Sequence, residues 1–78
     1  MAKVTLYRTN HCPWCHKAEE WFKAHKVQFN TKNVEEDDKA AEEMVRKSGQ
    51  RGVPVIDIDG KIIVGYDESE LKKALKIK

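Results

Sequence analysis

Apolar side chains recur along the chain with two different periods, and these periods predict the order of its elements. Residues 3–8 alternate polar and apolar side chains, with Val4 and Leu6 on one face, which is typical of a half-buried strand. From Pro13 to about His25 the apolar residues instead recur at spacings of three and four, as on one face of a helix. Pro13 suits the first position of that helix, because its missing N–H would have no partner there.

A second strand and a second helix are expected next. Residues 27–34 alternate well enough to predict a strand. Asp37 or Asp38 can cap the helix that follows, and Gly49 lies where a left-handed residue usually ends a helix. The apolar side chains that we expect on the buried edge of this helix are Ala41, Met44 and Val45.

The last third of the chain predicts a hairpin and a third helix. Residues 54–58 and 61–65 have the pattern of strands, and Asp59-Gly60 between them is one of the strongest two-residue hairpin signals. Residues 67–70 resemble a capping box at the start of a helix. The apolar face of that helix would consist of Leu71, Ala74 and Leu75.

The resulting order, β-α-β-α-β-β-α, defines an α/β fold. The first strand–helix–strand unit should be a right-handed crossover that makes its two strands parallel, and the hairpin should add two antiparallel strands. We therefore expect a mixed four-stranded sheet flanked by three helices. A chain of 78 residues has room for one domain, residues 1–78.

Composition excludes several classes of function. The chain is 40% apolar and 36% charged, as in a compact folded domain rather than a disordered or membrane-spanning chain. Its formal net charge of +2 is too small to indicate nucleic-acid binding. No signal peptide and no membrane segment are expected, and two cysteines do not make a secreted disulfide framework. We therefore expect a cytoplasmic, monomeric protein.

The reactive residues converge at Cys12-Pro13-Trp14-Cys15. Cys12 falls at the N-cap of the first helix, where free backbone N–H groups and the helix dipole favour a thiolate. Cysteines in such settings have pKa values of roughly 3.5–7.5, against about 8.5 for an unperturbed thiol. We hypothesise that Cys12 attacks a substrate disulfide and that Cys15, one turn further on, resolves the mixed disulfide.

Two other interpretations of the cysteine pair remain open. The pair could belong to a zinc or iron–sulfur site, or it could be two small buried residues. A structural zinc usually needs four ligands, and the sequence has no second CxxC. The other soft ligands, His11, His16 and His25, would need distorted geometry to converge on one ion. We therefore predict no metal site.

Four sequence blocks carry a resemblance to a known family. They are Cys12-Pro13-Trp14-Cys15, residues 49–54 (Gly-Gln-Arg-Gly-Val-Pro), Asp59-Gly60-Lys61 and Gly65-Tyr66-Asp67. In this order and at these spacings the chain resembles a glutaredoxin over nearly its whole length. The resemblance implies a thioredoxin-like fold and thiol–disulfide exchange with disulfide-containing proteins, without a tightly bound cofactor. The alternative function in this family is an iron–sulfur cluster or metal carrier that uses the CxxC cysteines.

The resemblance also implies a substrate site. Pro54 would have a cis peptide bond and pack beside the cysteines, and the backbone of Val53 would face an extended substrate. Gly65, Tyr66 and Asp67 would bind the γ-glutamyl end of glutathione, although Asp67 could simply cap the helix. Arg51 would pair with the opposite carboxylate of glutathione; a solvated loop arginine is the alternative.

Three positions depart from the glutaredoxin pattern. Val64-Gly65 replaces the usual two glycines, and Thr9 replaces the usual basic residue, with Arg8 one place off and facing the other way if the strand continues. Trp14 replaces a tyrosine; we expect it to be an exposed lid beside the sulfurs rather than a side chain that packs on Trp21. The electron donor therefore stays open between glutathione, another low-molecular-weight thiol and a thioredoxin reductase.

Overall fold

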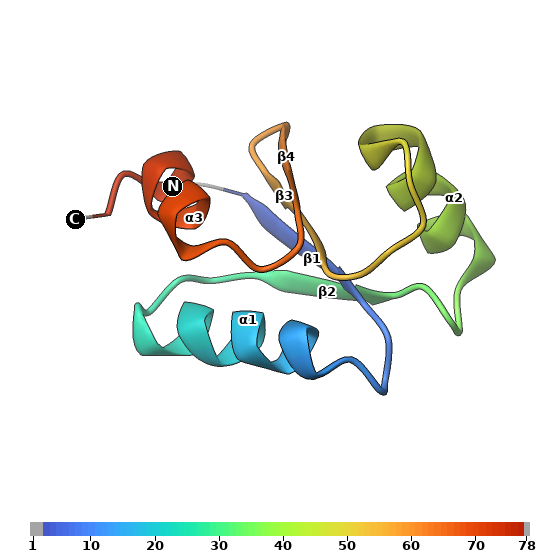
Figure 1. Ribbon diagram of the computed structural model, residues 1–78, viewed down its shortest axis with the longest axis horizontal. Helices are drawn as coiled ribbons and strands as arrows, with labels where there is room; N and C mark the ends of the chain where they lie inside the picture. Colours follow the sequence, from blue (N-terminus) through green and yellow to red (C-terminus); the bar gives the residue numbers. More distant parts are fainter. Residues whose placement is uncertain (1–2, 78) are drawn as a thin grey trace.

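The computed structural model describes residues 3–77 and confirms the expected order of elements (Figure 1). Met1, Ala2 and Lys78, which the predicted domain includes, lie outside the described residues. The elements are β1 (Val4–Arg8), α1 (Pro13–Ala24), β2 (Asn30–Asn33), α2 (Asp38–Ser48), β3 (Val55–Ile58), β4 (Lys61–Val64) and α3 (Glu68–Leu75).

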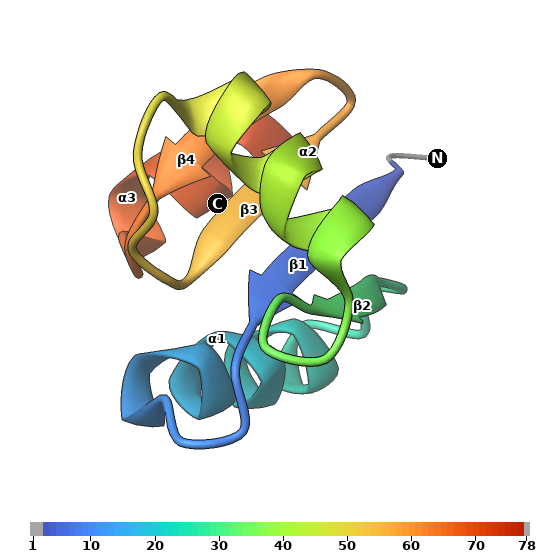
Figure 2. The same ribbon diagram turned by 90° about the vertical axis from the view of Figure 1, so that its right-hand side faces the viewer.

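The four strands form one mixed sheet in the order β2-β1-β3-β4. β1 and β2 are parallel, and β3 pairs antiparallel with both β1 and β4, as predicted. Helices α1 and α3 pack on one face of the sheet, and α2 lies on the other (Figures 1 and 2). Within residues 3–77, no helix has the length and apolar character that crossing a bilayer requires.

Two apolar clusters hold these layers together. The larger lies between the sheet and the pair α1 and α3, and the smaller lies between the sheet and α2. The alternation along β1 explains the division, because successive side chains of a strand point to opposite faces. Val4 and Leu6 enter the larger cluster, and Tyr7 enters the smaller one.

The second strand is shorter than the sequence pattern predicts. The parallel ladder starts where Thr5 of β1 pairs with Asn30, so the residues before Asn30 do not pair with β1. Val27 and Phe29 are nevertheless partly buried against the larger cluster. Their apolar pattern therefore reflects packing under α1 rather than pairing in the sheet.

The buried edge of α2 differs by one residue from the prediction. Ala40 and Met44 are buried, whereas Ala41 and Val45 are only partly so. Glu43 also faces the sheet, where it pairs with Lys32 of β2. The inner side of this helix therefore mixes apolar and charged residues. The buried face predicted from hydrophobicity alone is therefore rotated by one residue from the face that the structure buries.

The predicted caps and turn are confirmed. Asp37 caps α2 by accepting hydrogen bonds from the N–H groups of Lys39 and Ala40, and Gly49 ends the helix with φ +73°. Asp59 and Gly60 both have positive φ, 51° and 93°, as a type I′ hairpin turn requires.

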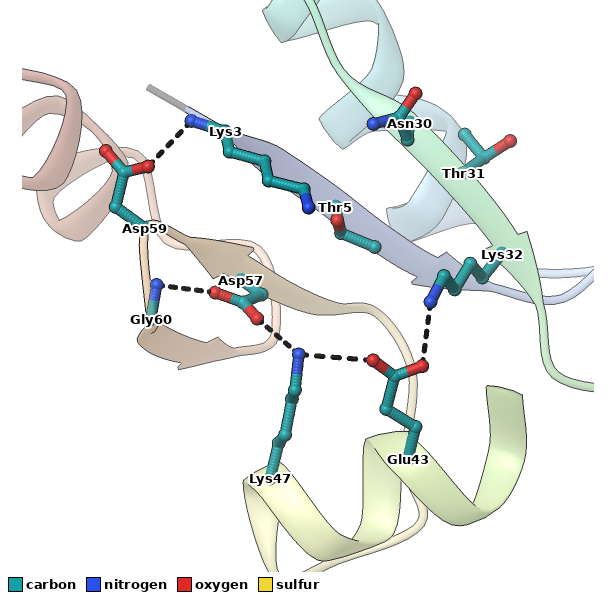
Figure 3. Close-up of a pocket in the computed structure, with 10 residues that line it drawn as sticks. All are labelled: Lys3, Thr5, Asn30, Thr31, Lys32, Glu43, Lys47, Asp57, Asp59 and Gly60. Atoms are coloured by element: carbon teal, nitrogen blue, oxygen red, sulfur yellow. Dashed lines mark hydrogen bonds and ion pairs between the residues drawn. The ribbon is translucent and has the colours of Figure 1, made fainter. Parts of the chain in front are cut away.

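A chain of four charged side chains ties α2 to the sheet (Figure 3). Lys32 of β2 lies 2.7 Å from Glu43, Lys47 lies 3.2 Å from Glu43, and Lys47 lies 2.7 Å from Asp57 of β3. They line a pocket of about 420 Å³ that also includes Lys3 and Thr5, at the start of β1. Because Cys12 follows the end of β1, this pocket lies at the opposite end of the sheet from the cysteines.

These contacts change the acidity of both carboxylates. The hydrogen bond from Lys32 lowers the pKa of the Glu43 carboxyl from about 4.5 to about 2; partial burial opposes this effect and Lys47 adds to it. Burial alone would raise the pKa of the Asp57 carboxyl, but hydrogen bonds from Lys47 and the Gly60 N–H lower it overall. The charged form of each carboxylate therefore stabilises the folded state.

We expect stability to fall in acid, chiefly because Glu43 becomes protonated. Its folded pKa lies below its ordinary value, so its contribution is complete above about pH 4.5 and is lost as the pH falls towards 2. Glu43→Gln should cost on the order of 2 kcal/mol at pH 7 and flatten this decline, as measured by urea unfolding at several pH values. The exposed neighbour substitution Glu42→Gln is the control, and parallel curves for Glu43→Gln and wild type would contradict the prediction.

Candidate active site

Three loops meet at the end of the sheet where β1 stops. The loop to α1 starts after Arg8. β3 begins at the same edge, because its first residue, Val55, pairs with Tyr7. β4 runs parallel to β1 and ends at this edge with Val64. The CxxC segment, the Val53-Pro54 peptide and residues 65–67 are therefore brought together by strand order alone. The sequence blocks that resemble a glutaredoxin all contribute to this edge, apart from the hairpin turn at Asp59-Gly60.

Cys12 is the N-cap residue of α1, as predicted. Its backbone is extended (φ −120°, ψ 100°), its carbonyl accepts from the His16 N–H at 3.1 Å, and its sulfur accepts from the Cys15 N–H at 3.1 Å. Sulfur thus occupies the place that the side-chain oxygen of serine or aspartate takes in other helix caps. In the reduced state the same amide would point at a thiolate, together with the positive end of the helix dipole.

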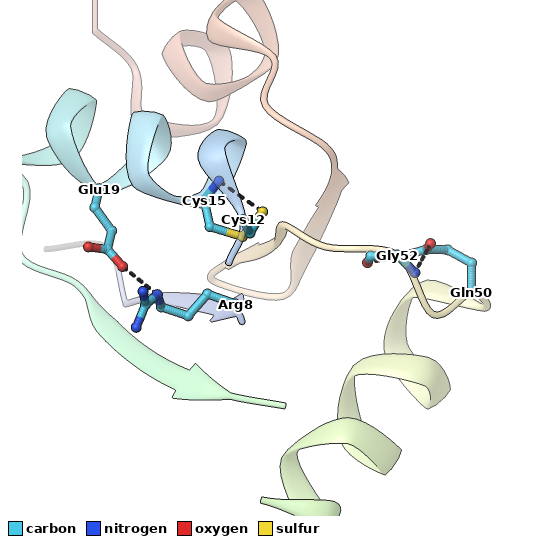
Figure 4. Close-up of a disulfide and its surroundings, with 6 residues drawn as sticks. All are labelled: Arg8, Cys12, Cys15, Glu19, Gln50 and Gly52. Atoms are coloured by element: carbon cyan, nitrogen blue, oxygen red, sulfur yellow. Dashed lines mark hydrogen bonds and ion pairs between the residues drawn. A yellow bond between two sulfur atoms is a disulfide. The ribbon is translucent and has the colours of Figure 1, made fainter. Parts of the chain in front are cut away.

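The two cysteines form a disulfide, with their Cα atoms 5.2 Å apart (Figure 4). Cys12 is 7% exposed, whereas Cys15, on the inner side of α1, is completely buried. An incoming thiolate can therefore reach only the sulfur of Cys12. This difference in access fits the predicted roles of Cys12 as nucleophile and Cys15 as resolving thiol.

The Val53-Pro54 peptide bond is cis, as the resemblance implied. Pro54 is buried, and its carbonyl accepts a hydrogen bond of 2.8 Å from the Gly65 N–H, which joins two of the three loops. Gly65 has φ +87°, a conformation that favours glycine. Within residues 3–77, no other group forms a hydrogen bond with the backbone N–H or C=O of Val53. Both groups are free to pair with an extended substrate.

Aromatic side chains form the rim next to the cysteines. Trp14 is 56% exposed and stacks on Tyr66, with ring centroids 6.0 Å apart, and the ammonium of Lys17 lies 5.3 Å from the indole centroid. Trp14 therefore contacts Tyr66 and not Trp21, as the exposed-lid prediction required. Burial, with a smaller contribution from Glu68, raises the pKa of the Tyr66 hydroxyl.

Asp67 caps α3, the simpler of its two expected roles. Its Oδ1 accepts from the Glu70 N–H at 3.2 Å, and its side chain is exposed. The second carboxylate oxygen has no partner within residues 3–77, so capping leaves it available to a ligand.

Arg51 and Gln50 lie in the loop that leads to Pro54. Arg51 is exposed and borders a groove along α2, so the structure does not direct it at the cysteines. The Gln50 side chain accepts from the Gly52 N–H and donates to the Gly52 carbonyl, and thereby braces the loop (Figure 4). This brace was not predictable from the sequence, because glutamine in a loop has many equivalent partners.

Arg8 is a neighbour of the cysteines whose partner the sequence did not predict. β1 continues to Arg8, so its side chain faces α1, and its Nε lies 2.7 Å from Oε1 of Glu19 (Figure 4). Two spacings could have predicted this pair. Arg8 lies on the same face of β1 as Leu6, and Glu19 lies on the same face of α1 as the buried Cys15, four residues earlier.

The histidines contribute no metal site in the described part of the chain. His11 and His16 are exposed, and His25 packs on Trp21 with ring centroids 4.2 Å apart. Residues 3–77 contain no group of three or more histidine, cysteine, aspartate or glutamate side chains placed to hold a metal ion.

A disulfide at the N-terminus of α1, beside a cis proline on a thioredoxin-like fold, is typical of the thiol–disulfide oxidoreductases. A family model, Glutaredoxin, matches residues 4–63. The chain belongs to the glutaredoxin family and is a thiol–disulfide oxidoreductase.

Individual relatives agree with this assignment. The chain is 45% identical to an uncharacterized glutaredoxin-like 8.6 kDa protein in the rubredoxin operon of Clostridium pasteurianum, over 94% of this chain and 97% of that protein. It is 35% identical to glutaredoxin 3 of Escherichia coli, over 87% of this chain and 82% of that protein. The crystal structure of the glutaredoxin grx-1 from Archaeoglobus fulgidus superposes with a TM-score of 0.87 at 30% identity, covering 97% of this chain and 88% of that one.

Proposed function

We propose that this protein reduces protein disulfides and glutathione mixed disulfides through a Cys12/Cys15 dithiol cycle in a reducing cytoplasm. The difference in exposure between the two cysteines supports this most directly, because Cys12 is the partly accessible one and Cys15 is completely buried. The Cys12 sulfur accepts a hydrogen bond from the Cys15 N–H at the N-terminus of α1, which favours the thiolate that such a cycle needs.

The cycle has two exchange steps. The Cys12 thiolate attacks one sulfur of the substrate disulfide, forms a new S–S bond and releases the other sulfur as a thiolate, which takes a proton from solvent. Cys15 then loses its proton and attacks the sulfur of Cys12, which forms the internal disulfide and releases the second substrate thiolate. The substrate gains two electrons, and the protein loses two.

Substrate would lie between the cis-proline loop and the start of α3. The free N–H and C=O of Val53 pair with an extended backbone, Pro54 positions that backbone beside Cys12, and Trp14 stacked on Tyr66 covers the apolar side. For glutathione, the Gly65 segment and the free oxygen of Asp67 accept the γ-glutamyl end, and Arg51 reaches a carboxylate by moving from its exposed position.

The substitution Asp67→Asn tests the glutathione assignment. Asparagine caps a helix about as well as aspartate does, so the fold should be unchanged while the charge that attracts the ligand's ammonium group is removed. We expect the rate of reduction of the protein disulfide by glutathione to fall about three- to tenfold. The rate with 2-mercaptoethanol, which has no ammonium group, should be unchanged.

An equal rate for the two proteins with glutathione would overturn the assignment of Asp67. NADPH with a thioredoxin reductase provides the comparison donor. If the wild-type protein turned over only with the reductase, the glutathione proposal would be wrong and the dithiol cycle would remain.

A further inference from the structure

The ion pair between Arg8 and Glu19 is the charged contact that lies under the cysteines on the inner side of α1. Arg8 ends β1, just before the loop to Cys12, and Glu19 follows Cys15 by four residues on α1. Side chains four apart on a helix have Cβ atoms about 5–6 Å apart, so Glu19 begins one turn below Cys15. Figure 4 shows the guanidinium and the carboxylate facing each other on the side of the disulfide away from the cis-proline loop.

Among the ion pairs of residues 3–77, this is the one in which neither side chain is more than one-fifth exposed. Each of its two side chains is 19% exposed, and the Nε atom of Arg8 is itself buried. The pair between Lys61 and Glu70, by comparison, is 50% and 40% exposed. Charges with little access to water are weakly screened, so this pair acts on its surroundings more strongly than a surface pair does.

The other charged side chains at this end of the sheet face solvent. They include His11, His16 and Lys17 around the start of α1, Glu35 and Asp38 after β2, Arg51 in the cis-proline loop, and Asp67 and Glu68 at the start of α3. Water screens their effect on the sulfurs, and their exposed positions leave them free to move. Arg8 and Glu19 are the partly buried charges beside the disulfide, and water screens them less than it screens the exposed ones.

We propose that Arg8 and Glu19 are positioning residues that set the balance between the dithiol and disulfide forms of the enzyme. The inference rests on the Cys12/Cys15 cycle proposed above. The Arg8 cation favours the reduced form, which carries a negative charge on Cys12, over the neutral disulfide. Glu19 holds the guanidinium in place and attenuates its field. Arg8 thereby supplies, from the inner face, a cation that Thr9 cannot supply from the rim.

The equilibrium with glutathione expresses this balance. Two glutathione thiols give two electrons to the protein disulfide, the Cys12–Cys15 bond breaks, and one S–S bond forms between the two glutathiones. Cys15 keeps one of the two protons, and the proton that Cys12 does not hold goes to solvent. Any group that stabilises the Cys12 anion moves this equilibrium towards the reduced protein.

Single charge removals should move the equilibrium in opposite directions. Glu19→Gln leaves the cation unopposed, so the equilibrium constant should shift about three- to tenfold towards the dithiol. Arg8→Met leaves the carboxylate unopposed, so the shift should be of similar size towards the disulfide. A tenfold change corresponds to about 30 mV. Arg8→Lys keeps the charge and should stay close to wild type.

The measurement is the fraction of reduced protein in glutathione buffers of graded ratio, read by thiol alkylation and mass spectrometry. Glu42→Gln and Lys23→Met repeat the two changes of net charge at exposed sites on α2 and at the end of α1. We expect the order Glu19→Gln, wild type, Arg8→Met from most to least reduced, with both controls close to wild type.

Two results would count against the proposal, and they differ from one another. Equal equilibrium constants for all variants would show that the ion pair only holds α1 to β1. Shifts of the same size in the two controls would show an effect of net charge alone. If Arg8→Met is too unstable to measure, Glu19→Gln and Arg8→Lys decide the question. A protein that never equilibrates with glutathione would instead contradict the proposed glutathione chemistry.

Discussion

Replacing Cys12 by serine should lower kcat/KM for disulfide reduction by roughly a thousandfold or more. Serine can still accept the hydrogen bond from the Cys15 N–H, so the cap and the fold should survive. A serine hydroxyl is not ionised at neutral pH and cannot form a disulfide, so the chemistry is lost. The assay is the reduction of a small disulfide by the pre-reduced protein under single-turnover conditions.

Cys15→Ser is the matched control for this result. Cys12 can still attack in that variant, but no thiol can resolve the product, so a stable mixed disulfide with the substrate should accumulate and be visible by mass spectrometry. Normal turnover by Cys12→Ser, or a mixed disulfide on Cys15 in place of Cys12, would reverse the assigned roles.

Phe22→Ala should have the largest effect on stability. Phe22 is completely buried in the larger cluster and contacts both Trp21 and Phe29. Truncating a fully buried phenylalanine costs about 3–5 kcal/mol, and a chain of this length has a total stability of about 4–12 kcal/mol. We expect the variant to lose most of its free energy of unfolding, measured in urea with the disulfide intact.

Phe29→Ala provides the comparison, because Phe29 packs on the same cluster but is only partly buried. Its cost should be less than half that of Phe22→Ala. Equal costs for the two substitutions would show that complete burial of Phe22 is not what makes its truncation destabilising.

Local signals in the sequence were sufficient for most of the architecture. Pro13 at the start of α1, Asp37 before α2, Asp59-Gly60 in the hairpin and Asp67 before α3 each determine a helix cap or turn through their own chemistry. The site could be predicted for the same reason. Cys12 and Cys15 are close in sequence, and the N-terminus of one helix fixes their geometry.

The features that the sequence did not reveal depend on contacts between distant elements. The pairing of Arg8 with Glu19 follows from how α1 lies on β1. The rotation of α2 follows from Glu43 and Lys47, whose partners Lys32 and Asp57 lie on two strands. Charged side chains are usually solvated, so an acidic residue in a helix gives no sign that it will face a sheet. The extent of β2 was also hidden, because Val27 and Phe29 pack on the larger cluster without pairing in the sheet.

The pKa of the Cys12 thiol in the reduced protein tests the central claim most directly. It can be measured from thiolate absorbance near 240 nm, or from the rate of alkylation by iodoacetamide, as a function of pH. We expect a value within the range of roughly 3.5–7.5 that cysteines at helix N-termini show, because the Cys15 N–H and the α1 dipole stabilise the anion. A thiol that titrates near the ordinary value of about 8.5 would contradict the account.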